Sequence, residues 1–304
     1  MKEISKITFA LTISCMIAAS AMGLTFTVTA KAKKHNHHMS VQNAMMDLLG
    51  FGEDNPPSSD LAFHNVYRYI VEDGDKKFLG YMVPVEKGGK EAYEMVLIDL
   101  EGKFAEKFEV PISEAQAEEA HDRASALEKV LPPNQFFAYA DASVIATAGG
   151  KRLGYVLPGK FPGFRTFIHA LVAMDPEFEL LGLEIMEHEE DAGLGAEIEQ
   201  EYFKNQFEGK SFETLKGLEV VKKPMPDEYK KYLEKSKWGE GMFTEEQIAE
   251  IQKQYKDSDI YAITASTISS KAVTDGVKNI AKKFAYRIGK LDGVLQEQKI
   301  HAAF

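Results

Sequence analysis

The chain is nearly free of cysteine: Cys15 is the single one among its 304 residues. One thiol excludes an intrachain disulfide, and it excludes the iron–sulfur, c-type haem and zinc sites that need several cysteines. Any redox chemistry must therefore depend on a bound organic cofactor. About half of the first apolar run follows Cys15, which does not suit a lipidation site.

The chain also lacks an excess of basic residues and the common hydrolase motifs. Its 36 Lys and Arg are outnumbered by 47 Asp and Glu, for a net charge of −11. Nucleic-acid binding calls for clustered basic residues, so we expect no nucleic-acid partner. The sequence contains no Gly-x-Ser-x-Gly elbow, no P-loop and no His-Glu-x-x-His helix. With 44% hydrophobic residues, it can bury the core of one large or two modest domains.

A long apolar run lies near the N-terminus. Residues 7–30 carry no charge and are bracketed by lysines on both sides. About 20 helical residues span the hydrocarbon core of a bilayer, whereas the apolar part of a signal peptide usually has about 7–15. We therefore expect residues 1–34 to be a membrane anchor that contacts the lipid bilayer through residues 7–30. The alternative is a cleaved signal peptide, with the small residues around Ala30 as the cleavage site.

A weak internal repeat follows the anchor. Residues 35–39 resemble a polar linker, and the pattern predicts a short helix over 40–51. Lys77–Pro84 then parallels Lys151–Pro158, each with a Gly-Tyr pair before an apolar strand. This predicts a repeat-like α+β module over residues 35–120 that partly duplicates the domain after it.

Helical patterns occupy much of the rest. The spacing predicts a helix over residues 114–131, and two polar helices within an insertion at 224–258. Thr244 and Gln247 have capping-box spacing at the start of the second of these. We expect residues 291–304 to be a C-terminal tail.

A run of hydroxyl side chains precedes a long amphipathic helix. Thr264, Ser266, Thr267, Ser269 and Ser270 lie just before apolar residues at helical spacing. Ser269 or Ser270 is the expected N-cap. The free amides and the positive end of the helix dipole at such a place suit a phosphate.

A glycine loop lies some 70 residues upstream, after a strand-like run. It reads His188-Glu-Glu-Asp-Ala-Gly193-Leu-Gly195. Two glycines one residue apart allow a tight turn and close approach to a flat ligand. The residue three after Gly195 is Ile198, so the loop is not a dinucleotide fingerprint.

Together the two segments resemble the FMN-binding domain of the electron-transfer subunits RnfG and NqrC. That family has a His-x-Glu-Thr-Pro-Gly-Leu-Gly loop and a Ser/Thr-Gly-Ala-Thr segment whose final Thr is esterified to the FMN phosphate. Thr267 matches that Thr, and the resemblance covers roughly residues 121–290. It implies an α+β fold: a transmembrane helix, then an FMN-binding domain of antiparallel strands with flanking helices, preceded by a partial duplicate of its first half.

The resemblance implies a membrane-anchored electron carrier, one subunit of an ion-translocating oxidoreductase of the Rnf/Nqr type. Its partners would be other membrane subunits, and its folded part would lie outside the cytoplasm. It is expected to be a redox subunit of a translocase rather than a self-sufficient enzyme. The implied FMN-contacting residues are Gly163, Glu190, Asp191, Gly193, Leu194, Gly195, Thr264, Ser266, Thr267, Ser269 and Ser270.

Three departures from the family pattern keep other interpretations open. Ala265 and Ser266 replace Gly-Ala, Tyr261 stands where an acidic residue is usual, and Asp191-Ala192 replaces Thr-Pro. One alternative is a flavin-free docking or scaffold protein of a membrane complex, and another is a secreted flavoprotein reductase. If FMN is present, Glu190 and Asp191 would disfavour an anionic reduced flavin, and His188 is either a proton shuttle or a plain surface residue.

Overall fold

The computed structural model describes residues 2–87, 90–239 and 241–304. The chain divides into two compact units between Asp47 and Leu48. We describe each unit by itself.

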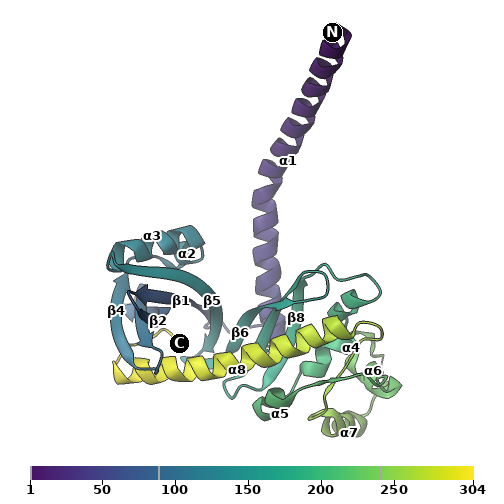
Figure 1. Ribbon diagram of the computed structural model, residues 1–304. Coiled ribbons are helices and arrows are strands. Elements are labelled where there is room, and N and C mark those ends of the chain that lie inside the picture. Colours follow the sequence, from purple (N-terminus) through teal and green to yellow (C-terminus); the bar gives the residue numbers. More distant parts are fainter. Residues whose placement is uncertain (1, 88–89, 240) are drawn as a thin grey trace. The chain divides into compact units, whose positions relative to one another are not determined.

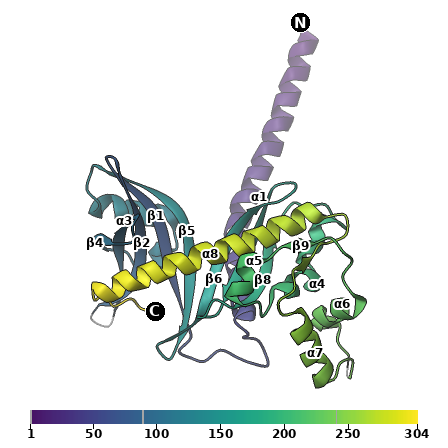
Figure 2. The same ribbon diagram turned by 60° about the horizontal axis from the view of Figure 1, so that its bottom comes forward.

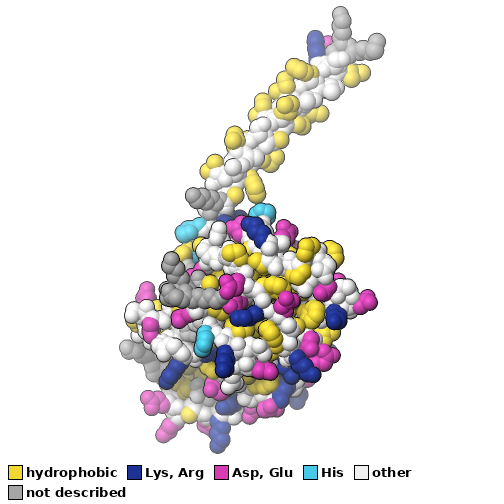
Figure 3. Space-filling view, turned by 90° about the vertical axis from the view of Figure 1, so that its left-hand side faces the viewer, with side chains coloured by type: hydrophobic (Ala, Val, Ile, Leu, Met, Phe, Trp, Pro, Cys, Tyr) yellow, Lys and Arg dark blue, Asp and Glu magenta, His cyan; other side chains and the backbone are white. Residues whose placement is uncertain are grey.

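The N-terminal unit is one long helix, α1 (Lys2–Leu48). An 18-residue window has a mean hydropathy of 1.9, so length and composition allow the helix to cross a membrane, a test that a signal sequence also passes. Figure 3 shows hydrophobic side chains along it. The predicted linker at residues 35–39 was wrong: the helix continues through it, because neither proline nor glycine interrupts residues 24–49. It ends two residues before Gly50, which has a φ of +79°.

The described part of the second unit contains an eight-stranded antiparallel sheet in the order β4-β3-β2-β1-β5-β6-β7-β8. Two four-stranded meanders are joined where β1 pairs with β5 (Figures 1 and 2). The strands are β1 (Ala62–Asp73), β2 (Lys76–Lys87), β3 (Lys90–Asp99), β4 (Phe104–Val110), β5 (Gln135–Ala148), β6 (Lys151–Pro162), β7 (Phe167–Met174) and β8 (Leu180–Glu187).

The repeated Gly-Tyr pairs occupy matching places in the two meanders. Tyr81 lies in β2 and Tyr155 in β6, each the second strand of its meander. The two segments share one sheet, and the duplication itself stays a prediction. The helix predicted over 114–131 is interrupted: α2 (Glu114–Ala117) and α3 (Ala120–Val130) are separate.

Helix α8 (Thr267–Glu297) crosses the sheet from the second meander to the first (Figures 1 and 2). Its predicted apolar face is confirmed: Val273, Val277, Ala281, Phe284 and Ile288 are all buried in the main core. The predicted tail was wrong at its start, because Leu291, Val294 and Leu295 continue this buried face past residue 290.

Gly276 allows α8 to approach the sheet closely. A Cβ at this position would collide with the ring of Phe161 on β6. Glycine inside a helix usually costs stability, so the close contact explains its presence here.

Short elements connect β8 to α8. They are η1 (Gly195–Glu199), α4 (Glu201–Lys204), η2 (Asn205–Phe207), α5 (Phe212–Gly217), β9 (Val220–Val221), α6 (Asp227–Leu233), η3 (Lys235–Lys237), α7 (Glu245–Tyr255) and β10 (Ile260–Tyr261). The two predicted helices of the insertion are present, although the first ends earlier, at Leu233. The capping box of Thr244 and Gln247 at the start of α7 is confirmed.

Candidate functional site

A tight turn leads into α8. The Ser266 amide donates to the carbonyl oxygen of Ile263 at 3.0 Å, and Ala265 within the turn has a φ of +61°. This left-handed conformation favours glycine, which is the residue usual at this position in the family that the sequence resembles. Ala265 therefore keeps the backbone shape that the pattern requires, at a cost in strain.

The helix begins three residues earlier than predicted. Its N-cap is Ser266 and its first residue is Thr267, so the expected cap at Ser269 or Ser270 was wrong. The Ser270 hydroxyl accepts from the Ile263 amide at 3.0 Å and donates to the Ser266 carbonyl oxygen at 2.9 Å. Because these bonds hold the turn, Ser270 is buried behind it and does not face solvent.

The first turn of α8 is open to an anion. The Ser266 side chain makes no capping hydrogen bond to it; its hydroxyl donates instead to Ser269 Oγ at 3.1 Å. The amides of Thr267, Ile268 and Ser269 lack intrahelical partners by their position, and they lie at the positive end of the helix dipole. Within the described residues, the Thr267 hydroxyl also takes part in no hydrogen bond.

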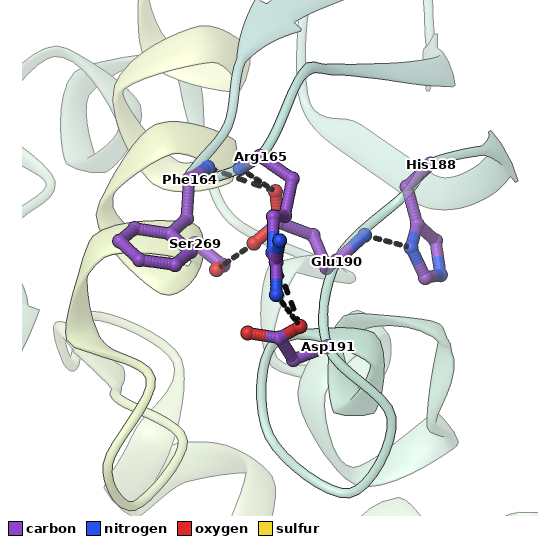
Figure 4. A network of polar contacts seen from close by, with 6 residues as sticks. All are labelled: Phe164, Arg165, His188, Glu190, Asp191 and Ser269. Atoms are coloured by element: carbon purple, nitrogen blue, oxygen red, sulfur yellow. Dashed lines mark hydrogen bonds and ion pairs between the residues drawn. The ribbon is translucent and has the colours of Figure 1, made fainter.

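Glu190 ties three segments together (Figure 4). Its Oε1 accepts from the amides of Phe164 at 2.8 Å and Arg165 at 3.1 Å, both in the β6–β7 turn. Its Oε2 accepts from the hydroxyl of Ser269 in the first turn of α8. Glu190 is only 7% exposed. A buried carboxylate with three donors fixes the glycine loop against both neighbours.

Two of the predicted glycines make room for Glu190. A Cβ at Gly163 would collide with Glu190 Oε1, and one at Gly195 would lie 2.7 Å from Glu190 Oε2 and 2.9 Å from Ser269 Oγ. Gly193 is required for another reason, since its φ is +73°. The sequence associates these glycines with the ligand, whereas the structure also gives them a role in packing.

His188 holds the entry to the glycine loop. Its Nδ1 accepts from the Glu190 amide at 3.0 Å, and its Nε2 lies 2.8 Å from Glu199 Oε1. Its side chain is 9% exposed, so it is not a plain surface histidine. An acceptor at Nδ1 and a donor at Nε2 describe the neutral tautomer with its proton on Nε2. His188 thus positions Glu190.

Asp191 shapes the loop through its backbone and pairs with Arg165 at the surface. Its carbonyl oxygen accepts from the amides of Leu194 and Ala196, both at 3.1 Å. Its carboxylate lies 2.6 Å from the guanidinium of Arg165, and both side chains are largely exposed. A solvated pair of this kind contributes little stability.

These segments enclose an open pocket of about 770 Å³, counting its mouth. Phe164, Leu194 and Ile268 expose apolar surface around it. Of the residues predicted from sequence, seven line it, and Gly163, Gly193, Thr264 and Ser270 do not. The seven are Glu190, Asp191, Leu194, Gly195, Ser266, Thr267 and Ser269. Apolar walls beside open amides suit a ligand with a flat apolar part and an anionic part.

Gln206 supports the site and was missed. It is 2% exposed. Its Oε1 accepts from the Tyr261 amide at 2.7 Å, and its Nε2 donates to the Tyr261 carbonyl oxygen at 3.2 Å. Gln206 therefore fixes β10, the strand that leads into the turn before Thr267. No sequence signal marks it, because a glutamine in a polar stretch is usually solvated.

The site belongs to a known class of domain. Residues 163–282 match the family model described as the FMN-binding domain. The match contains the glycine loop, the segment before α8 and the first half of that helix. The chain therefore contains a member of the FMN-binding domain family, and the resemblance seen in the sequence is confirmed.

The particular relatives are components of ion-translocating complexes. The chain is 30% identical over 138 residues to the G-type component of the proton-translocating ferredoxin:NAD(+) oxidoreductase complex of Clostridium ljungdahlii. The aligned part covers 45% of this chain and 57% of that protein, so the chain spans little more than half the length of this relative.

Two solved structures are also similar. NqrC of Shewanella oneidensis has a TM-score of 0.34 at 18% identity, over 48% of this chain and 57% of that one. The C-type component of the Na(+)-translocating NADH-quinone reductase of Parabacteroides distasonis has a TM-score of 0.31 at 19% identity, over 64% of this chain and 74% of that one.

Proposed function

We propose that the protein is a membrane-anchored electron carrier that holds FMN, as one subunit of an ion-translocating oxidoreductase of the Rnf/Nqr type. The observation that carries this proposal is the pocket at the start of α8. It combines open first-turn amides, the Thr267 hydroxyl and apolar walls within a domain of the FMN-binding family. FMN would supply the redox chemistry, which no cysteine-based centre in this chain can provide.

The residues of the pocket have distinct parts in this proposal. The amides of Thr267, Ile268 and Ser269 would bind the phosphate, and the Thr267 hydroxyl would be its ester partner. Phe164 and Leu194 would exclude water from the apolar part of the cofactor. The φ of +61° at Ala265 supports covalent attachment, since the turn keeps the shape that glycine gives it in the family.

The N-terminal helix supports the proposed location. We infer that α1 anchors the protein in the cytoplasmic membrane through residues 7–30, with the second unit on the extracytoplasmic side. Other membrane subunits would then deliver and accept the electrons, and the N-terminal meander would be a structural or docking module without its own flavin.

Intact mass and in-gel flavin fluorescence after denaturation test the proposal on protein made in its native host. The wild type should carry one FMN less one water, because an ester between the Thr267 hydroxyl and the phosphate releases water. Thr267→Ala should lose the adduct, and Thr264→Ala, three residues away and exposed, should keep it. An adduct that survives Thr267→Ala would refute the attachment site. A wild type that is colourless in its native state would favour a flavin-free docking protein.

A further inference from the structure

A second pocket lies between the sheet and α8, where the two meanders join. Tyr81 of β2 is the register partner of Arg68 on β1, and Arg68 is in turn the partner of Asp141 on β5. Directly opposed residues lie on the same face of a sheet, so the three side chains form a polar row across three strands. Arg287 reaches this row from α8.

Two guanidinium groups in this row share one carboxylate. Arg68 donates to Asp141 through Nε at 2.8 Å and also through Nη2, and Arg287 donates through Nη1 at 3.1 Å. The cluster therefore carries a net charge of about +1. Its remaining polar groups on the two arginines are all N–H donors, because a guanidinium has no acceptor.

Tyr81 is buried beside these arginines without a hydrogen-bond partner. It is 5% exposed, and its phenol oxygen is unsatisfied among the described residues. Burial raises the pKa of Tyr81, while Arg68 and Arg287 oppose the change. The phenol is thus protonated near neutral pH and can donate. A buried hydroxyl without a partner is unfavourable for folding, so each such group calls for an explanation.

The rest of the pocket is apolar. It measures about 510 Å³, counting its open mouth. Its walls include Val66, Leu157, Ile280, Phe284 and Leu291. Asp141 and Arg287 are 43% and 28% exposed, against 5% for Tyr81, so the charged groups are accessible and the phenol is deep.

We propose that this pocket binds a small monocarboxylate with an apolar body. The carboxylate would accept from the free N–H groups of the arginines and from the Tyr81 hydroxyl, and the body would contact the apolar walls. An uncharged apolar molecule would leave the phenol unpaired, and an inorganic anion would leave the walls uncovered. The site lies along α8 from the Thr267 turn and does not depend on bound FMN.

Thermal unfolding of the full-length protein in a mild nonionic detergent tests this proposal, with benzoate and hexanoate as probes. Either probe should raise the melting temperature saturably, and sodium sulfate at matched ionic strength should not. Tyr81→Phe should weaken the apparent affinity about tenfold, because it removes one hydrogen bond to a charged group. The ligand-free variant should be as stable as the wild type, since the phenol has no partner to lose.

Two further variants sharpen the result. Tyr286→Phe, an exposed tyrosine next to Arg287 that does not line this pocket, should leave the affinity unchanged. Arg287→Gln should weaken binding in the same assay, as an independent variant to Tyr81→Phe. No saturable shift with either carboxylate, an equal shift with sulfate, or full affinity in Tyr81→Phe would each overturn the proposal.

Discussion

Removal of the Glu190 side chain should destabilise the second unit strongly. In Glu190→Ala, the amides of Phe164 and Arg165 and the hydroxyl of Ser269 lose their shared acceptor. Each unsatisfied donor costs about 1–3 kcal/mol. Water can reach the partly exposed turn, and removal of a buried charge returns some free energy. We therefore expect a net loss of about 3 kcal/mol in the free energy of unfolding, a large part of a typical total of about 5–15 kcal/mol.

Glu190→Gln should cost about half as much. Its amide oxygen can still accept from the two backbone amides, and the Ser269 hydroxyl can rotate to accept from the new N–H₂ group. What is lost is the charge, which strengthens hydrogen bonds roughly twofold.

Urea unfolding of the full-length protein in detergent, followed by fluorescence, measures both losses. Trp238 is the single tryptophan, and it packs with Tyr232 and Phe243 in the second unit. Glu189→Ala is the matched control, because Glu189 is adjacent and exposed; its effect should stay within about 0.5 kcal/mol. A loss in Glu190→Ala no larger than in this control would refute the clamp.

Three further predictions concern single positions. Ala265→Gly should raise the free energy of unfolding by about 0.5–1 kcal/mol in urea, because it relieves the left-handed strain; a decrease would contradict this. Gly276→Ala should destabilise by about 1–3 kcal/mol through collision with Phe161, although helix propensity alone predicts a gain of about 1 kcal/mol. Burial lowers the pKa of Lys210 from 10.5 to about 8, with Asp257 and Asp259 opposing. Between these values the unfolded chain binds more protons, so wild-type stability relative to Lys210→Met should rise from pH 8 to pH 10.5, and a flat difference would refute it.

Periodicity and local motifs could be predicted because they depend on neighbours in the sequence. The apolar face of α8 repeats at helical spacing, and the capping box at Thr244 is contained in four residues. The continuity of α1 was missed because a polar segment such as His35–His38 resembles a linker, although nothing in it breaks a helix.

The details of the site could not be predicted because they depend on distant partners. Glu190 accepts from donors 25, 26 and 79 residues away, so its clamping role is not visible in the loop. The start of α8 was misplaced because Ser270 bonds back to Ile263 rather than capping the helix. The row of Tyr81, Arg68 and Asp141 depends on strand register, which the sequence does not specify.

The position of α8 in the chain has a consequence for biosynthesis. The helix follows every strand of the sheet along the sequence, yet its first turn supplies Ser269 to Glu190, and its later turns cover the sheet. The chain must therefore be made through α8 before the pocket can close. An enzyme that modifies Thr267 would meet either an unfolded segment or the finished domain, so maturation at this residue is a late event.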